Sequence, residues 1–103
     1  MPDFANLRER MVQRQIESRG IRDPAILEAF RSVPREAFVD EKNRKWAYDD
    51  HPLPIEAGQT ISQPYIVALM IEAAGFKPGD KVLEIGAGSG YAAASLARPT
   101  QAY

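Results

Sequence analysis

Residues 81–91 read Lys-Val-Leu-Glu-Ile-Gly-Ala-Gly-Ser-Gly-Tyr, a short apolar run followed by three glycines at alternate positions. The run at 81–85 is typical of a buried parallel strand, and the alanine-rich residues 91–97 favour a helix that Pro99 ends. Glycines between a strand and a helix let the chain turn sharply and let a ligand approach the N–H groups at the helix start. This order predicts an α/β fold with a ligand at the glycine loop; a plain tight turn is the alternative.

The spacing of the glycines narrows the choice of ligand. The dinucleotide fingerprint G-x-G-x-x-G needs its third glycine at position 91, where this chain has Tyr91, and no Gly-Lys-Ser/Thr of a P-loop follows. The pattern Glu84-x-Gly86-x-Gly88-x-Gly90 resembles the first motif of Rossmann-like methyltransferases. That resemblance implies S-adenosyl-L-methionine as the cofactor, with the three glycines and Glu84 at its site. Glu84 also has a plainer interpretation, as a charge at the end of a strand.

The residues upstream of this motif are mainly helical in pattern. Apolar residues at helical spacing predict one amphipathic helix, which Asp3 caps and Gly20 ends. Asp23-Pro24 is a second helix start, because proline loses nothing at the first helical position. Residues 48–57 are proline-rich and predict a loop. Residues 64–74 are apolar nearly all round and predict a helix that is buried on most faces.

A second motif makes the resemblance more specific. Residues 58–64 read Gly-Gln-Thr-Ile-Ser-Gln-Pro, and together with residues 82–91 they resemble the protein-L-isoaspartate O-methyltransferase family, which methylates the abnormal carboxyl group of isoaspartyl residues in damaged proteins. The resemblance runs from the first helix to about Ala97 and includes Val33-Pro34-Arg35. It implies a helical N-terminal region ahead of a Rossmann-like methyltransferase sheet. It also implies isoaspartyl-containing proteins or peptides as the substrate.

The same resemblance assigns roles in the 58–64 motif. It implies that Ser62 is the catalytic residue and that Gln59, Thr60, Ile61 and Ser62 line the cofactor site. The family commonly has histidine where this chain has Tyr65, which changes a contact on the substrate side.

Methyl transfer to a carboxylate requires few special groups. An ordinary carboxyl is already ionised at neutral pH, so the protein must chiefly supply proximity and alignment. A hydroxyl such as that of Ser62 can donate a hydrogen bond to the carboxylate. Taken from its local sequence alone, Ser62 is better read as a cap for the helix that Pro64 begins. The family resemblance reverses that preference.

Composition excludes several other classes of protein. The chain has 103 residues, a formal charge of -1, no cysteine and one histidine. A nearly neutral chain has no electrostatic footprint for nucleic acid, and the lack of cysteine excludes a disulfide scaffold and a Cys-based zinc site. No apolar run approaches the roughly 20 residues that span a bilayer, so we expect neither a membrane contact nor a secreted protein but a cytoplasmic one. His51, beside two aspartates, is read as part of a solvated loop, and no metal is expected.

The length of the chain shapes the domain prediction. We expect one partial methyltransferase domain over 1–103, with a helical region and loop at 1–57, and the active-site turn, buried helix, first strand and cofactor loop at 58–103. Only 13 residues follow Gly90, whereas the acidic residue that holds the ribose in such folds lies about 20 residues beyond the glycine loop. A truncated fold is therefore expected. Two alternatives stay open: self-association through the incomplete sheet, and a catalytically silent binding or interaction module.

Overall fold

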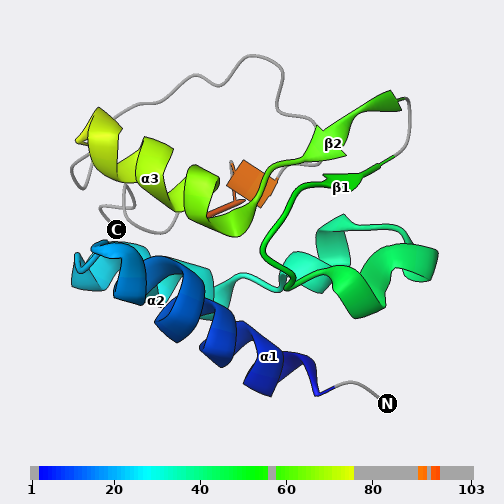
Figure 1. Ribbon diagram of the computed structural model, residues 1–103, viewed down its shortest axis with the longest axis horizontal. Coiled ribbons are helices and arrows are strands. Elements are labelled where there is room, and N and C mark those ends of the chain that lie inside the picture. The colour runs from blue at the N-terminus through cyan, green and yellow to red at the C-terminus, as the bar shows by residue number, and fades with distance from the viewer. Residues whose placement is uncertain (1–2, 56–57, 76–90, 93, 96–103) are drawn as a thin grey trace.

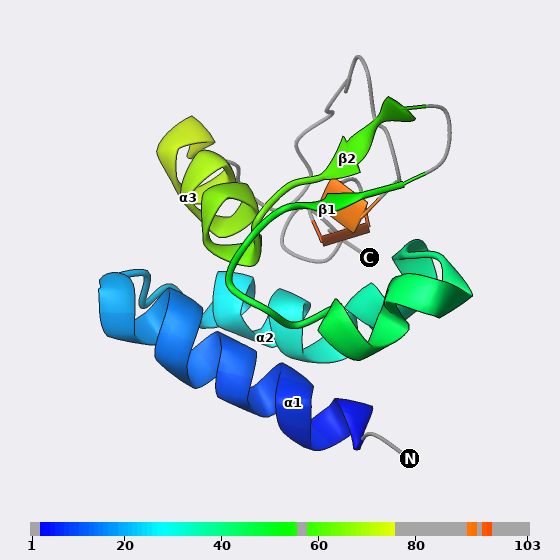
Figure 2. The ribbon, with the colours of Figure 1, turned by 45° about the vertical axis from the view of Figure 1, so that its right-hand side comes forward.

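Two helical segments lie side by side along one side of the molecule, and a third helix crosses above them, next to a small hairpin (Figures 1 and 2). The structure is a computed structural model that describes residues 3–55, 58–75, 91–92 and 94–95. The predicted strand at 81–85 and the glycine loop lie outside these residues. The helices are α1 (Phe4–Met11), α2 (Pro24–Ser32) and α3 (Pro64–Ala74), and the strands are β1 (Leu53–Pro54) and β2 (Thr60–Ile61). None of the helices in the described ranges is long and apolar enough to cross a membrane.

The first helical segment has the predicted ends but an irregular middle. Asp3 caps α1 by accepting a hydrogen bond from the backbone N–H of Asn6 at 3.1 Å, and Gly20 ends the segment at φ +103°. Between them α1 gives way to a π-helical turn, Val12–Ile16, and a 3-10 turn, Glu17–Arg19. The predicted helix between Asp3 and Gly20 therefore has its predicted ends, but α-helical geometry holds only as far as Met11.

The spacing of the buried side chains explains the π-turn. Met11 and Ile16 are both buried, at 1% and 0% exposure, and are five residues apart. In a regular α-helix that spacing would point them about 140° apart, whereas the i→i+5 geometry of a π-turn brings them toward the same face. The burial of both side chains favours the wider turn.

The second helix begins as the sequence predicts. Pro24 occupies the first turn of α2, and the Asp23 carboxylate accepts a hydrogen bond from the N–H of Ala25 at 2.9 Å. The helix ends at Ser32 because Val33, which precedes a proline, takes an extended conformation. Its apolar side chains join a single core to which α1, the π-turn, both strands and α3 contribute; the buried members from α2 are Ile26, Leu27, Ala29 and Phe30.

A two-residue antiparallel strand pair replaces part of the predicted loop. Leu53 pairs with Ile61 and Pro54 pairs with Thr60, and the N–H of Ile55 donates to the carbonyl oxygen of Gln59 at 2.9 Å. The loop prediction for 48–57 is wrong at this point. The apolar alternation that signals a strand needs more than two residues to be visible in sequence.

Helix α3 has the predicted bounds, and Gly75 closes it in a left-handed conformation at φ +67°. Its predicted burial on most faces is wrong for the described structure. One face, with Val67, Ala68 and Ile71, packs on the core, whereas the opposite side exposes 38% of Ile66, 37% of Leu69 and 65% of Met70.

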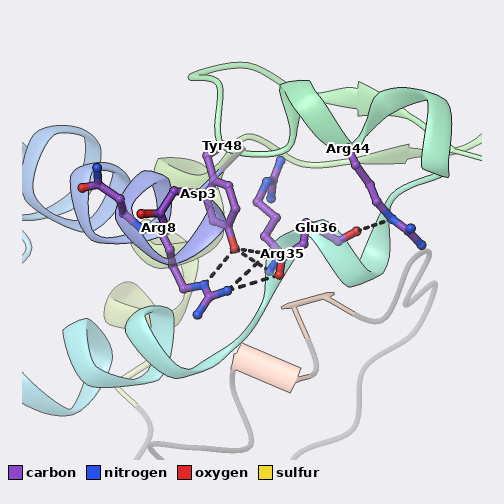
Figure 3. Close-up of polar contacts among 7 residues, drawn as sticks. Asp3, Arg8, Arg35, Glu36, Arg44 and Tyr48 are labelled. Carbon is purple, nitrogen blue, oxygen red and sulfur yellow. Dashed lines mark hydrogen bonds and ion pairs between the residues drawn. The ribbon is translucent and has the colours of Figure 1, made fainter. Parts of the chain in front are cut away.

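The hydroxyl group of Tyr48 joins three parts of the N-terminal region (Figure 3). It accepts hydrogen bonds from Arg8 Nε at 2.8 Å and from the backbone N–H of Arg35 at 3.0 Å, and it donates one to Glu36 Oε1. A phenolic hydroxyl has one proton and two lone pairs, so every hydrogen-bonding position of Tyr48 is used. The guanidinium of Arg8 also contacts the Glu36 carboxylate, at 3.2 Å.

This arrangement changes the acidity of both partners. Burial raises the pKa of the Tyr48 hydroxyl, and the neighbouring Glu36 carboxylate reinforces the effect. Burial alone would raise the pKa of Glu36 as well, but the hydrogen bonds from Tyr48 and Arg8 outweigh it and the pKa is lowered. At neutral pH the network therefore consists of a neutral phenol between a cation and a carboxylate.

Replacing Tyr48 with phenylalanine tests this network. Tyr48→Phe keeps the ring and leaves the Arg35 N–H and a Glu36 oxygen without their partner, so we expect a loss of about 1–3 kcal/mol in the free energy of unfolding. Urea denaturation measures it. Tyr65→Phe is the matched control, because the Tyr65 hydroxyl has no hydrogen bond within the described residues, and it should leave the midpoint unchanged. Equal midpoints for the two variants would contradict the role given to Tyr48.

Candidate functional site

The predicted site residues at 59–62 are Gln59, which precedes β2, the two residues of β2, and Ser62 in the turn that leads into α3. Gln59, Thr60 and Ser62 are exposed, whereas Ile61 is 2% exposed and belongs to the core. Successive side chains of a strand point to opposite faces, which explains the alternation. The side chain of Ile61 therefore holds the strand on the core, and only its backbone remains for contact with a ligand.

Ser62 does not cap the helix that follows it. The residue at the N-cap of α3 is Gln63, and no side chain makes a capping hydrogen bond there. The capping interpretation of Ser62 is therefore wrong. Among the described residues the Ser62 hydroxyl has no hydrogen-bond partner, so it is available to an incoming group.

The residue after Ser62 is bound to the loop that precedes β1. Gln63 Nε2 donates to Asp50 Oδ1 at 2.7 Å. The same carboxylate accepts both arms of the Arg19 guanidinium, with Nη1 3.0 Å from Oδ1 and Nη2 bonded to Oδ2. Hydrogen bonds from Arg19 and then from Gln63 lower the pKa of Asp50, so the carboxylate stays ionised well into the acid range.

Tyr65 contacts the same arginine from the first turn of α3. The Arg19 guanidinium carbon lies 5.3 Å from the centre of the Tyr65 ring, a distance at which a cation is attracted to the ring face. Position 65, where the resemblance leads us to expect histidine, is therefore occupied by a ring that packs on Arg19. The contacts of Arg19 with Asp50 and with Tyr65 could not be predicted from the sequence, because Arg19 is far along the chain from both residues.

Tyr91, the residue directly after the glycine loop, is held in the N-terminal core. It is 1% exposed, and its ring meets those of Phe30 and Phe38 at centroid distances of 6.0 and 5.7 Å. The buried guanidinium of Arg35 lies 4.8 Å from the ring centre. Burial raises the pKa of Tyr91 to about 12 even though Arg35 acts in the opposite direction. In the sequence, Tyr91 begins an alanine-rich segment and stands where a dinucleotide-binding loop has its third glycine. Neither pattern predicts the burial of its ring against Phe30 and Phe38.

The other predicted site residues divide into two groups. Glu84, Gly86, Gly88 and Gly90 lie outside the described residues. His51 is exposed, with Nε2 3.4 Å from Asp49 Oδ2. In the part of the chain that the structure describes, no group of three or more potential ligands could hold a metal ion.

Comparison with known proteins identifies the family. The family model for protein-L-isoaspartate(D-aspartate) O-methyltransferase matches residues 6–102. The chain belongs to this family. A protein-L-isoaspartate O-methyltransferase of Methylorubrum extorquens is 65% identical over 98 residues, which are 95% of this chain and 43% of that protein. Protein-L-isoaspartate O-methyltransferase 1 of Rhodopseudomonas palustris is 67% identical over 95 residues, 92% of this chain and 39% of that protein.

Solved structures agree with the sequence comparison. A protein-L-isoaspartate O-methyltransferase superposes with a TM-score of 0.80 at 35% identity, covering 90% of this chain and 30% of that one. A putative enzyme of the same name from Plasmodium falciparum, in complex with S-adenosyl-L-homocysteine, gives a TM-score of 0.75 at 28% identity over 90% of this chain and 42% of that one. These likenesses confirm the predicted Rossmann-like methyltransferase fold. The chain spans about two fifths of the curated relatives it matches.

The burial of Ile61 gives a direct test of its structural role. Ile61→Val removes one methylene from the core, so we expect the free energy of unfolding to fall by about 0.5–1.5 kcal/mol. The matched control is Ile66→Val, the same change at a side chain that is 38% exposed on α3, which should cost much less. Urea denaturation of both variants measures the difference. Equal losses would show that Ile61 is not the residue that holds β2 on the core.

Proposed function

We propose that the chain carries the front part of an isoaspartyl methyltransferase, which transfers a methyl group from S-adenosyl-L-methionine to isoaspartyl carboxyl groups in damaged proteins. Family membership over residues 6–102 supports the class of reaction. The observation that carries the assignment to this site is the exposed Ser62 side chain, whose hydroxyl has no hydrogen-bond partner among the residues that the structure describes and whose neighbours are fixed. The proposal includes a single partial methyltransferase domain over 1–103, with its helical region at 1–57 and its cofactor and active-site region at 58–103.

The cofactor assignment rests on the residues around that turn. Exposed amide and hydroxyl groups of Gln59, Thr60 and Ser62 suit a ligand with amino, carboxylate and hydroxyl groups, and they lie on one short segment. We assign Glu84, Gly86, Gly88 and Gly90 to the same cofactor. The bound sulfonium supplies the methyl group. The S-adenosyl-L-homocysteine in the Plasmodium falciparum relative is what remains of the cofactor after such a transfer.

Ser62 has a positioning task in this chemistry. The isoaspartyl carboxylate is ionised at neutral pH and is itself the nucleophile, so no residue has to remove a proton from it. The Ser62 hydroxyl can donate a hydrogen bond to one carboxylate oxygen and leave the other directed at the methyl group. Fixing the two reacting groups in line is the larger part of what an enzyme supplies to such a displacement.

The proposal also covers the binding partners of the protein and its location in the cell. Isoaspartyl-containing proteins or peptides are the substrate partners, and the protein is cytoplasmic. Self-association belongs to the same proposal, with support from the apolar side chains of Ile66, Leu69 and Met70 exposed on α3.

Calorimetric titration of the chain with S-adenosyl-L-homocysteine tests the cofactor assignment. We expect binding by the unmodified chain and its loss in Gly88→Val, because an added side chain blocks the approach of a ligand to the glycine backbone. Ala73→Val adds similar bulk at an exposed position of α3 and should bind as the unmodified chain does. A folded chain that does not bind would instead favour the silent interaction module.

Methyl transfer to an isoaspartyl peptide tests Ser62. Ser62→Ala removes a hydrogen bond to a charged group, so we expect the rate to fall about tenfold or more. Ser18→Ala changes an exposed serine whose hydroxyl donates to the Arg14 carbonyl oxygen. It serves as the control and should keep the rate. Unfolding curves for both variants should match that of the unmodified chain. An unchanged rate in Ser62→Ala would remove Ser62 from the proposed mechanism.

A further inference from the structure

The turn at 59–63, which carries Ser62, is fixed at both ends by one segment of the chain. At its start the N–H of Ile55 donates to the Gln59 carbonyl oxygen at 2.9 Å, next to the β1–β2 pair. At its end Gln63 Nε2 donates to Asp50 Oδ1 at 2.7 Å. Residues 50–55 therefore form a frame for the turn, and the position of Ser62 depends on where that frame lies.

Asp50 is the point at which the frame meets the first helical segment. Its carboxylate takes one hydrogen bond from Gln63 and both arms of the Arg19 guanidinium. A two-armed contact fixes orientation as well as distance, because the planar guanidinium matches the planar carboxylate. Arg19 thus sets the direction in which Asp50 presents its free lone pairs to Gln63.

Arg19 also contacts the first turn of α3. Its guanidinium carbon lies 5.3 Å from the centre of the Tyr65 ring, so it contacts both Asp50 and Tyr65, while Asp50 contacts Gln63. Gln63 and Tyr65 both follow Ser62 in the sequence, so these contacts hold the chain on the C-terminal side of Ser62. Arg19 itself comes directly before Gly20, whose left-handed conformation ends the helical segment.

The ion pair between Arg19 and Asp50 should have a small effect on the stability of the whole protein and a larger effect on the turn that it contacts. The Arg19 and Asp50 side chains are 37% and 38% exposed, and ion pairs at such positions contribute little to global stability. The charged and titratable groups that act on Asp50 include Arg19 and His51, and Tyr65 acts on Arg19. A pair of this kind can hold one turn in place without deciding whether the protein folds.

We propose that Arg19 and Asp50 are positioning residues, which act through Gln63 and Tyr65 to hold the Ser62 hydroxyl where the carboxylate of the substrate is methylated. The inference rests on the proposed function, and it adds two residues that the sequence motif does not contain. Neither residue touches the reacting atoms.

Amide hydrogen exchange of the whole chain tests the local effect. In Arg19→Met we expect the Ile55 amide and the amides at 59–63 to exchange about threefold to fivefold faster, the size expected of a partly exposed ion pair. The Phe30 amide in α2 should be unchanged. Arg14→Met is the matched control, because Arg14 is exposed on the same segment and its side chain has no partner in the described ranges.

Asp50→Asn keeps the shape of the side chain and removes its charge. It is the second variant for the same exchange measurement, and it replaces Arg19→Met if that variant folds poorly. It should produce the same local acceleration. Because the two residues act as a pair, the double variant should exchange no faster than either single one. Lysine cannot hold both carboxylate oxygens, so Arg19→Lys should fall between the unmodified chain and Arg19→Met. Additive effects, an unchanged Ile55 amide, or equal acceleration in Arg14→Met would each overturn the proposal.

The rate of methyl transfer supplies the functional readout. Arg19→Met should lower kcat about threefold and leave KM for the isoaspartyl peptide unchanged, because the hydroxyl is misplaced and no peptide contact is lost. A change in KM alone would overturn the positioning role. If the unmodified chain neither binds the cofactor analogue nor transfers a methyl group, the proposed function fails, and the exchange measurements still decide whether Arg19 and Asp50 hold the turn.

Discussion

The hydroxyl of Tyr48 is the contact on which the rest of the described structure depends. It joins α1 through Arg8, the turn after α2 through Arg35, and the Glu36 carboxylate, and it does so with all three of its hydrogen-bonding positions. The carbonyl oxygen of Tyr48 is held as well, by Gln15 Nε2 at 2.7 Å. The chain therefore leaves residue 48 from a fixed point and in a fixed direction.

The position of the turn that carries Ser62 depends on the fixed position of Tyr48. Six residues, 49–54, connect Tyr48 to Ile55, and they carry Asp50 and β1, which hold the turn that carries Ser62. A strand pair of two residues is too short to be stable by itself. It persists because Leu53 and Ile61 are buried in the core, at 5% and 2% exposure, and because Asp50 and Gln63 bind one another beyond the end of the pair.

Sequence reasoning succeeded where a structure depends on a few adjacent residues. The Asp3 and Asp23 caps and the left-handed glycines at 20 and 75 were predicted because each is a local device. The family was predicted because two motifs are each contiguous. The contact between Arg19 and Asp50 joins residues 31 positions apart, and the contact between Arg35 and Tyr91 joins residues still farther apart. No local sequence pattern predicts either contact. The exposed face of α3 was missed for a related reason: composition shows that a helix is apolar, but only packing shows which faces are covered.

The π-turn in the first helical segment has a consequence for the length of that segment. A π-turn brings a residue five positions on to about the angle at which a regular α-helix places a residue four positions on. The turn at Val12–Ile16 therefore holds one residue more than a regular helix would, with Arg19 still directed at Asp50. Loss of one residue from this turn would restore a regular helix and keep that direction. Each further residue removed would rotate Arg19 by about 100° around the helix axis.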